Sequence, residues 1–495
     1  MNQTLLTGNK MAEQNRPLIK STDLCDLSAL DMLALLRNKE ISAVELLQDH
    51  LQRIRQVNPR VNALVTLVDE DILLQQARAI DNGWMKGVWQ GCLHGLPVSQ
   101  KDLIATKGVR TTFGSRAFTD YVPTADALIV QRCTQAGALM IGKSNTPEFG
   151  AGSHTFNDVF GATLNPWDTT KSAGGSSGGT AVSIACGMNP VACGSDMGGS
   201  LRNPAAWNNV VGLRPSPGRV PRVPDANGWM TLGVDGPMGR TVADTALLLS
   251  AIAGPSAATP TEINEAGARF ALPLQHDFKG CKLAISAGIP GIPVDPEIMT
   301  MVQAQAAIFD AMGLEVELMD VDFGHVEEVF RSERAWIMGG LVDSLPEHLR
   351  PLLKDEVHDE YRLYRSLSAG DLSRIFQQKT ELFQRMKRFL DQYDFYVLPS
   401  CQMHPFPASQ RWPNQFMGQD YGNYIDWMRQ SWYLSSTEHP VLALPCGFSA
   451  SGMPVGLQVV GRFRDEWSLL QFGHAYEMAT QHGRTRPPLL SALTP

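Results

Sequence analysis

The chain has 495 residues, of which 43% are hydrophobic and 19% are charged, and its formal net charge is −8. This composition is typical of an ordinary soluble globular protein and excludes a disordered or fibrous chain. An acidic chain of this kind shows no excess of basic residues that would bind nucleic acid or an anionic membrane surface, so we expect a small neutral ligand.

The N-terminal part predicts amphipathic helices. The sequence Ser42-Ala43-Val44-Glu45 has the pattern of a capping box, in which the serine and glutamate side chains satisfy unpaired backbone donors. Apolar residues then recur at helical spacing, at Val44, Leu47, Leu51 and Ile54. We expect Asn58-Pro59 to end this helix, because proline lacks the helical N–H donor.

Through the middle of the chain, short apolar runs alternate with helical patterns. One strand-like run ends at Lys101, a second covers 138–145, and a third begins at Lys282. A helix is expected to follow from Asp295-Pro296. This alternation predicts an α/β protein with helices on both faces of a sheet. Near the C-terminus, strand-like runs lie at 396–399, 441–445 and 456–460 and are joined by short loops. A long helical pattern lies at 371–391. This arrangement predicts that the sheet is mixed rather than purely parallel.

The eight cysteines are scattered without a C-x-x-C pair, and the chain has no H-E-x-x-H motif. We therefore expect reduced, mostly buried thiols and no metal or cofactor.

Residues 172–195 are uncharged, but their glycines and Asn189-Pro190 would leave backbone groups unsatisfied in lipid, so a buried loop and helix is predicted. The first residues do not have the pattern of a secretory signal, which makes the cytoplasm the expected compartment.

A loop rich in glycine and serine, K-S-A-G-G-S-S-G-G-T, covers 171–180. A serine hydroxyl is a weak nucleophile unless a neighbouring base takes its proton. The loop formally satisfies G-x-S-x-G with Ser177 at the centre, but that motif needs a strand directly before it. Residues 165–171 read instead as a turn-rich loop, so Ser177 is not favoured as the nucleophile.

Two further segments complete a constellation. In G-S-D-M-G-G-S-L-R-N-P-A-A-W at 194–207, Ser200 follows two glycines, a turn that can bring backbone N–H groups to one point. In P-V-S-Q-K-D at 97–102, Lys101 follows a predicted buried strand, where desolvation would lower its pKa and make the neutral amine accessible as a base.

Together these segments resemble the amidase signature family, serine hydrolases with a Ser-Ser-Lys triad. The resemblance covers most of the chain and includes the runs at 94–102, 138–150, 161–167, 210–220, 235–244 and 452–461. It implies the amidase signature fold, in which a large mixed, twisted β-sheet core is covered by helices on both faces. We expect one domain over 1–495, with N-terminal helices at about 26–60, a catalytic core at about 61–255 and a helical, substrate-shaping region at about 320–435.

The resemblance also implies the role of each candidate site residue. Lys101 would be the base, Ser176 the bridging serine and Ser200 the nucleophile, with a cis peptide bond before Ser176. The expected oxyanion donors are the backbone N–H groups of Met197, Gly198, Gly199 and Ser200. Ser177 is expected to hydrogen-bond within its loop, and Asp196 and Arg202 to fix the turn. Where the commoner family pattern has Thr-Asp-Thr, this chain has Ser195-Asp196-Met197.

The expected activity is hydrolysis of a small, aryl or hydrophobic carboxamide to carboxylate and amine or ammonia through an acyl-enzyme. Two alternatives stay open: the glutaminase (A) subunit of a tRNA-dependent amidotransferase, and a non-catalytic binding protein on the same fold. No nucleic acid or membrane partner is expected, and a homodimer is left open. Several residues are candidates either for an apolar pocket or for the core, namely Trp336, Met338, Tyr361, Trp427, Met428 and Trp432.

Overall fold

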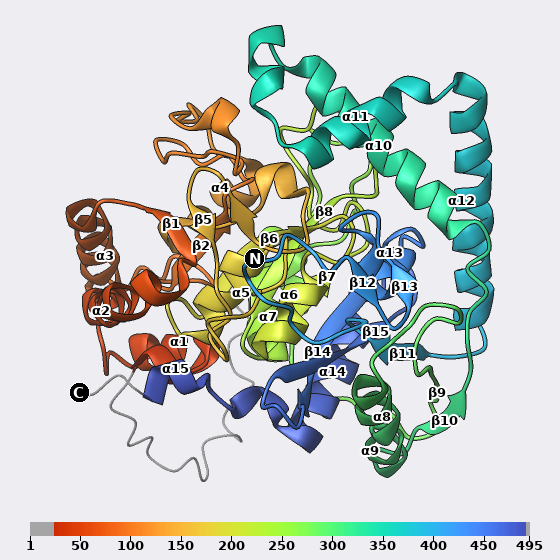
Figure 1. Ribbon diagram of the computed structural model, residues 1–495. Helices are drawn as coiled ribbons and strands as arrows, with labels where there is room; N and C mark the ends of the chain where they lie inside the picture. The colour runs from red at the N-terminus through yellow and green to blue at the C-terminus, as the bar shows by residue number, and fades with distance from the viewer. Residues whose placement is uncertain (1–23, 492–495) are drawn as a thin grey trace.

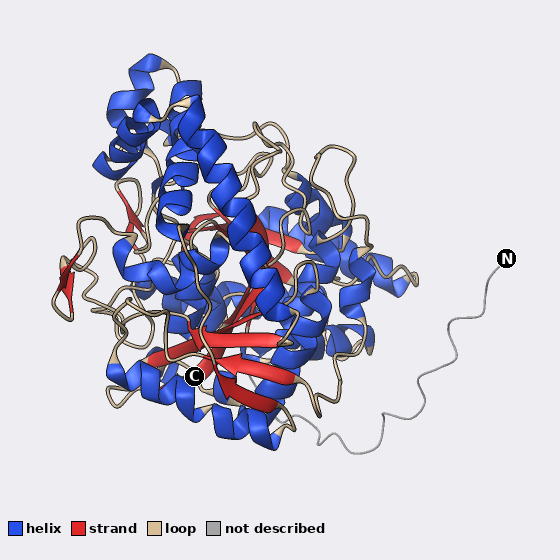
Figure 2. Ribbon diagram, turned by 90° about the vertical axis from the view of Figure 1, so that its right-hand side faces the viewer, coloured by secondary structure: helices blue, strands red, loops and turns tan. Residues whose placement is uncertain are grey.

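An eleven-stranded mixed sheet runs through the centre of the protein (Figures 1 and 2). The computed structural model describes residues 24–491, so the ends of the expected domain, 1–23 and 492–495, lie outside it. From one edge to the other the strands are β1 (Leu64–Leu67), β3 (Leu139–Ser144), β2 (Pro97–Lys101), β6 (Val191–Asp196), β8 (Val234–Gly239), β7 (Val211–Arg214), β14 (Val441–Phe448), β15 (Pro454–Val460), β11 (Phe395–Pro399), β9 (Lys282–Ile285) and β10 (Glu315–Leu318).

The pairing confirms the prediction of a mixed sheet. Strand β2 pairs in parallel with β3 and β6, and β9 pairs in parallel with β10 and β11, while the remaining neighbours are antiparallel. Two small hairpins lie outside this sheet, β4 (Phe156–Asn157) with β5 (Gly161–Ala162) and β12 (Gln415–Phe416) with β13 (Gln419–Asp420). Since β2 lies between two parallel neighbours and is buried along its whole length, its last residue is held deep in the protein.

Helices cover both faces of the sheet (Figure 2). They are α1 (Ala29–Arg37), α2 (Ala43–Val61), α3 (Glu70–Met85), α4 (Leu128–Gln135), α5 (Gly178–Ala185), α6 (Arg202–Asn208), α7 (Val242–Ile252), α8 (Pro296–Ala304), α9 (Ala306–Ala311), α10 (Val326–Ser344), α11 (Asp355–Ser366), α12 (Ala369–Leu390), α13 (Arg429–Ser435), α14 (Glu466–Thr480) and α15 (Pro488–Ser491). Helix α10 packs against both α11 and α12, and the three helices stand at one side of the molecule (Figure 1, teal).

Helix α2 has the predicted start but not the predicted end. The Ser42 and Glu45 side chains form the capping box. The helix then continues past Pro59 to Val61, so the expected stop at Asn58-Pro59 is wrong. Pro59 lacks an N–H and so removes one hydrogen bond near the end of the helix, which stops where Asn62 adopts a left-handed conformation with φ of 52°.

The described part of the chain has an extensive apolar core and a mixed surface. Apolar side chains of α2, α7 and α14 pack with those of the strands in the largest core cluster. Helix α5 and the glycine-serine loop before it are buried, as predicted.

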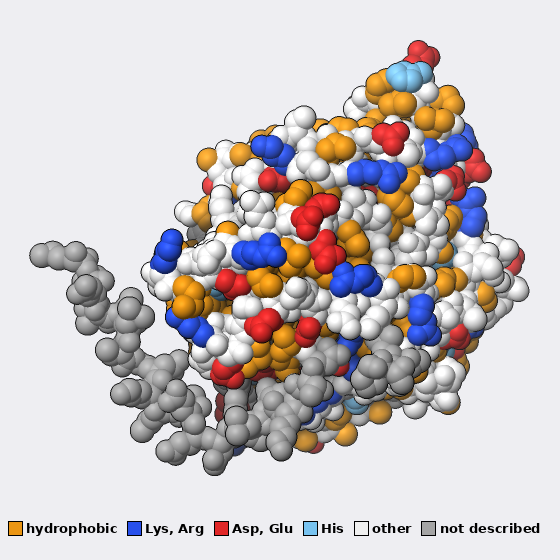
Figure 3. All heavy atoms as spheres, turned by 90° about the vertical axis from the view of Figure 1, so that its left-hand side faces the viewer, with side chains coloured by type: hydrophobic (Ala, Val, Ile, Leu, Met, Phe, Trp, Pro, Cys, Tyr) orange, Lys and Arg blue, Asp and Glu red, His pale blue; other side chains and the backbone are white. Residues whose placement is uncertain are grey.

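No helix within 24–491 is long and apolar enough to cross a membrane. On the face shown in Figure 3, basic and acidic side chains of the described residues are interspersed.

Candidate active site

Lys101 is the last residue of β2 and is completely buried. Its Nζ lies 2.7 Å from Ser176 Oγ, 2.9 Å from Ser177 Oγ and 3.0 Å from Ser195 Oγ. The pKa of Lys101 is lowered from its ordinary 10.5 to about 7, chiefly by burial and to a smaller extent by Arg222, whereas Asp196 and Asp235 act in the opposite direction. The side chain is therefore an amine that loses its proton near neutral pH, surrounded by three hydroxyls.

The glycine-serine loop places two of these hydroxyls beside the lysine. The peptide bond between Gly175 and Ser176 is cis, as the family resemblance implies. Glycine is favoured at Gly175, because a Cβ atom there would lie 3.0 Å from the Ser153 carbonyl carbon, a tight contact. The loop leads directly into α5, so Ser176 and Ser177 are fixed between a helix and the end of the sheet.

The Ser177 hydroxyl reaches out of its loop, contrary to the expectation that it bonds within it. Its Oγ contacts Lys101 and donates to the backbone carbonyl of Ser195 at 3.2 Å. The Ser177 amide also donates to the Ser200 carbonyl at 3.3 Å. Ser177 thus ties the lysine, the end of β6 and the turn that carries Ser200 to one another.

A buried carboxylate fixes the turn between β6 and α6. Asp196 accepts hydrogen bonds from the amides of Gly199, at 2.9 Å, and Leu201, at 3.0 Å. It also forms ion pairs with Arg202, at 3.1 Å, and Arg214, at 3.2 Å. Burial alone would raise the Asp196 pKa, but the two guanidinium groups outweigh it and hold that pKa well below its usual range. The expectation that Asp196 and Arg202 fix this turn agrees with these contacts.

One expected oxyanion donor is not available. The Gly199 N–H is engaged by the Asp196 carboxylate, and Gly199 does not line the adjoining pocket. The residues of the turn that line it are Met197, Gly198 and Ser200. Gly199 has φ of 114°, and a Cβ atom there would lie 2.5 Å from Ser431 Cβ, so its role is to let the chain turn closely against α13.

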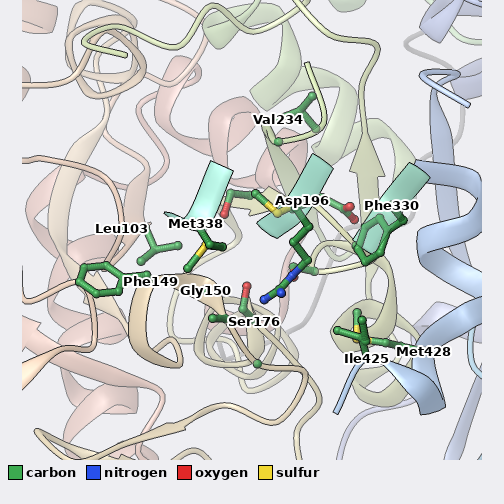
Figure 4. Close-up of a pocket in the computed structure, with 18 of the residues that line it drawn as sticks. Leu103, Phe149, Gly150, Ser176, Asp196, Val234, Phe330, Met338, Ile425 and Met428 are labelled. Carbon is green, nitrogen blue, oxygen red and sulfur yellow. The ribbon is translucent and has the colours of Figure 1, made fainter. Parts of the chain in front are cut away.

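Ser176 and Ser200 open into one cavity of about 630 Å³, a volume that includes its mouth. Figure 4 shows Ser176 low in the cavity, with Leu103, Phe149 and Met338 on one side and Phe330, Ile425 and Met428 on the other. The full lining is Leu103, Phe149, Gly150, Ala151, Gly152, Ser176, Ser195, Asp196, Met197, Gly198, Ser200, Arg222, Gly233, Val234, Phe330, Arg334, Met338, Tyr424, Ile425 and Met428. Most of this surface is apolar.

Of the six residues considered for either pocket or core, Met338 and Met428 line the cavity. Trp427 and Trp432 are fully buried in the core, where Trp432 stacks on Phe330 at 4.5 Å between ring centroids. Trp336 packs edge-on against Phe376, and Tyr361 donates to Asp343 on the surface. The remaining four were therefore core or surface residues.

Sequence reasoning missed three polar residues of the site. Ser195 was noted only as a departure from the family pattern, yet its hydroxyl contacts Lys101. No pattern in the sequence indicates this contact, because it arises from the pairing of β2 with β6 in the sheet. Arg222 and Arg334 line the cavity from a loop and from α10, and no sequence motif points to either of them.

Comparison with known proteins places this geometry in a family. The model of the Amidase family matches residues 45–470. The chain belongs to the amidase family. This amidase is 33% identical over 467 residues to the acylamidase of Rhodococcus erythropolis, covering 93% of this chain and 97% of that protein. It is 34% identical over 480 residues to a glutamyl-tRNA(Gln) amidotransferase (A) subunit from Picosynechococcus, covering 91% and 97% of the two chains.

Solved structures agree with the fold. A bacterial aryl acylamidase of the amidase signature family superposes with a TM-score of 0.86 and 26% identity, over 93% of this chain and 99% of that one. A 6-aminohexanoate cyclic dimer hydrolase in complex with its substrate gives a TM-score of 0.83 at 25% identity, over 94% and 100% of the two chains. This amidase therefore has the predicted amidase signature fold and is a hydrolase of carbon–nitrogen bonds.

Proposed function

We propose that this amidase hydrolyses a small, neutral aryl or hydrophobic carboxamide through an acyl-enzyme on Ser200, with Ser176 and Lys101 as the proton relay. The observation that carries the proposal is the 2.7 Å contact between Lys101 Nζ and Ser176 Oγ at the base of a largely apolar cavity that Ser200 shares. A buried amine with a pKa of about 7 can accept a proton from a hydroxyl at neutral pH.

The relay runs from the nucleophile to the lysine and back. As Ser200 Oγ attacks the amide carbon, its proton passes to Ser176 Oγ, and the Ser176 proton passes to neutral Lys101 Nζ. When the C–N bond breaks, the ammonium of Lys101 returns a proton through Ser176 to the leaving nitrogen. Water then attacks the ester on Ser200, loses a proton to the same relay, and the carboxylate leaves as Ser200 recovers its proton.

The tetrahedral intermediate needs donors for its negative oxygen. We assign this role to the backbone N–H groups of Met197, Gly198 and Ser200, the residues of the turn that line the cavity. Asp196 supports them indirectly, because its hydrogen bonds to the Gly199 and Leu201 amides fix the turn. Every catalytic group in this mechanism belongs to the chain, and the proposal includes no metal or cofactor.

The charge of the cavity supports a neutral substrate over free glutamine, the substrate of the glutaminase alternative. A bound amino acid has to place its ammonium beside an anion, since an unpaired charge is costly to desolvate. Among the described lining residues, the one carboxylate is Asp196, and Arg202 and Arg214 already occupy it. The acylamidase and aryl acylamidase relatives also support an acyl or aryl amide as the substrate. Because amidotransferase (A) subunits are similarly related to this chain, the glutaminase alternative is tested as well.

The test is a panel of purified protein against aryl amides, alkyl amides and glutamine. We expect the aryl amides to be cleaved, glutamine to be left intact, and Ser200→Ala to abolish turnover while Ser451→Ala, the same change on an exposed turn, does not. Faster release of ammonia from glutamine than from any aryl amide would support the glutaminase alternative. No turnover of any amide would support the non-catalytic one. The compartment and the oligomeric state stay predictions from the sequence.

A further inference from the structure

Helix α10 presents one face to the active-site cavity. Phe330, Arg334 and Met338 all line the cavity and are spaced four residues apart, so they lie on the same side of the helix. Phe330 is the nearest of them to the nucleophile turn, because a Cβ atom on Gly198 would lie 3.0 Å from Phe330 Cζ. Arg334 follows one turn farther along, about 6 Å by helical rise, which is of the order of the span of an aromatic ring.

Arg334 brings a charge into this apolar wall, but the charge is balanced. Only 4% of Arg334 and 6% of Glu360 are exposed, and the two form an ion pair between α10 and α11. The guanidinium also donates to the Tyr424 hydroxyl and lies 5.3 Å from the centroid of that ring. Lys354 approaches the same ring at 5.7 Å, so two cations lie close to the Tyr424 ring.

The other charges of the cavity are balanced in the same way. Arg222, the second cation of the lining, has Asp235 at 3.7 Å and Asp225 at 3.8 Å. Asp196 is paired with two arginines, as described above. A charged substrate group would therefore lose its hydration without gaining an uncompensated partner, whereas a neutral group can still accept a hydrogen bond from a guanidinium.

We propose that the Arg334–Glu360 pair determines which substrates this amidase accepts. Arg334 favours an amide that carries a neutral hydrogen-bond acceptor about one aromatic ring away from the scissile bond. Glu360 cancels the attraction of Arg334 for a carboxylate at that position and so excludes anionic amides. This inference rests on the proposed function, in which Ser200 attacks a carboxamide in the same cavity.

The experiment compares substrates that differ only in the charge of a para substituent. One pair is 4-nitroacetanilide and 4-acetamidobenzoate, and the other is 4-nitrobenzamide and 4-carbamoylbenzoate, so that either side of the scissile bond can face α10. We expect kcat/KM to favour the nitro compound at least tenfold in one pair. In Glu360→Gln, Arg334 loses its counter-ion, and the carboxylate-to-nitro ratio of kcat/KM should rise about tenfold.

Matched variants separate this effect from loss of folding. Asp359→Asn removes the same charge from the neighbouring, exposed position of α11, where the carboxylate pairs with Arg362, and it should leave the ratio unchanged. Should Glu360→Gln fail to fold, the double variant Arg334→Met/Glu360→Met replaces the buried pair with apolar side chains, a change that proteins often tolerate. It should retain the fold, and its kcat/KM ratio for 4-nitroacetanilide over 4-methylacetanilide should fall below that of the wild type, leaving only the preference for the better leaving group.

Binding to the Ser200→Ala variant gives a readout that does not depend on turnover. Dissociation constants of the same compounds should follow the same ratios, with Glu360→Gln strengthening carboxylate binding about tenfold relative to nitro. An unchanged ratio in a folded Glu360→Gln protein, or an acceptor preference in the double variant that is as large as in the wild type, would overturn the inference. Absence of turnover with the expected binding ratios would instead count against the proposed function alone.

Discussion

The acid limb of the pH–rate profile should report the protonation of Lys101. The relay needs the neutral amine, so kcat/KM should rise with pH up to about 7, the pKa of this lysine, and then level off. Two charged neighbours move the limb in opposite directions. Arg222→Gln removes a group that lowers the Lys101 pKa, so the limb should move to higher pH. Asp235→Asn removes a group that raises it, so the limb should move to lower pH.

The size of the effect follows from the burial of Lys101. With a pKa of about 7, about half of the lysine is neutral at pH 7, about 9% at pH 6 and about 1% at pH 5. With its ordinary pKa of 10.5, about 0.03% would be neutral at pH 7. Burial therefore raises the concentration of the working base roughly 10³-fold at neutral pH, and activity should fall about tenfold for each pH unit well below 7.

The assay is initial-rate hydrolysis of an aryl amide between pH 5 and 9 for the wild type and both variants. The position of the limb is the readout, because Arg222 lines the cavity and its loss also affects KM. Arg374→Gln and Asp371→Asn make the same charge changes at an exposed pair on α12, and they should leave the limb where it is. A flat profile from pH 5 to 9, or limbs that coincide in all five proteins, would refute the assignment of Lys101 as a buried base.

Two further changes test the turn that carries Ser200. Asp196→Asn leaves Arg202 and Arg214 buried without their anion. The free energy of unfolding, measured by urea titration, should therefore fall by about 3–5 kcal/mol. An unchanged midpoint of urea unfolding would contradict the role of Asp196 in fixing the turn. Gly199→Ala places a Cβ atom 2.5 Å from Ser431 Cβ at φ of 114°, so turnover should drop by at least about 100-fold. Gly452→Ala is the control, because Gly452 also has a positive φ, of 79°, but has open space around it. Equal losses of turnover in the two variants would show that backbone strain, rather than the clash with Ser431, causes the loss.

The parts of the site that could be predicted are those encoded by contiguous residues. The strand ending at Lys101 and the two glycine-serine segments are local patterns, and the structure brings Lys101 into contact with Ser176 and opens Ser176 and Ser200 into one cavity. The mixed sheet followed in the same way from short apolar runs whose lengths and flanking loops are visible in the sequence.

The parts that could not be predicted depend on contacts between distant segments. Ser195 reaches Lys101 because β2 and β6 are neighbours in the sheet, and Arg334 reaches the cavity because α10 packs over the turn after β6. Trp432 is buried behind Phe330 rather than exposed to substrate, a distinction that spacing in the sequence does not contain. The Gly199 amide was misassigned for a related reason, since the carboxylate that engages it belongs to a residue expected only to support the turn.

The most direct test of the mechanism is the identity of the serine that becomes acylated. The purified protein is treated with a fluorophosphonate, digested, and the labelled peptide is mapped by mass spectrometry, with Ser200→Ala and Ser177→Ala treated in parallel. We predict a single label on Ser200, lost in Ser200→Ala and retained in Ser177→Ala. A label on Ser177 or Ser176 that persists in Ser200→Ala would contradict the account, because the loop would then carry the nucleophile rather than the relay.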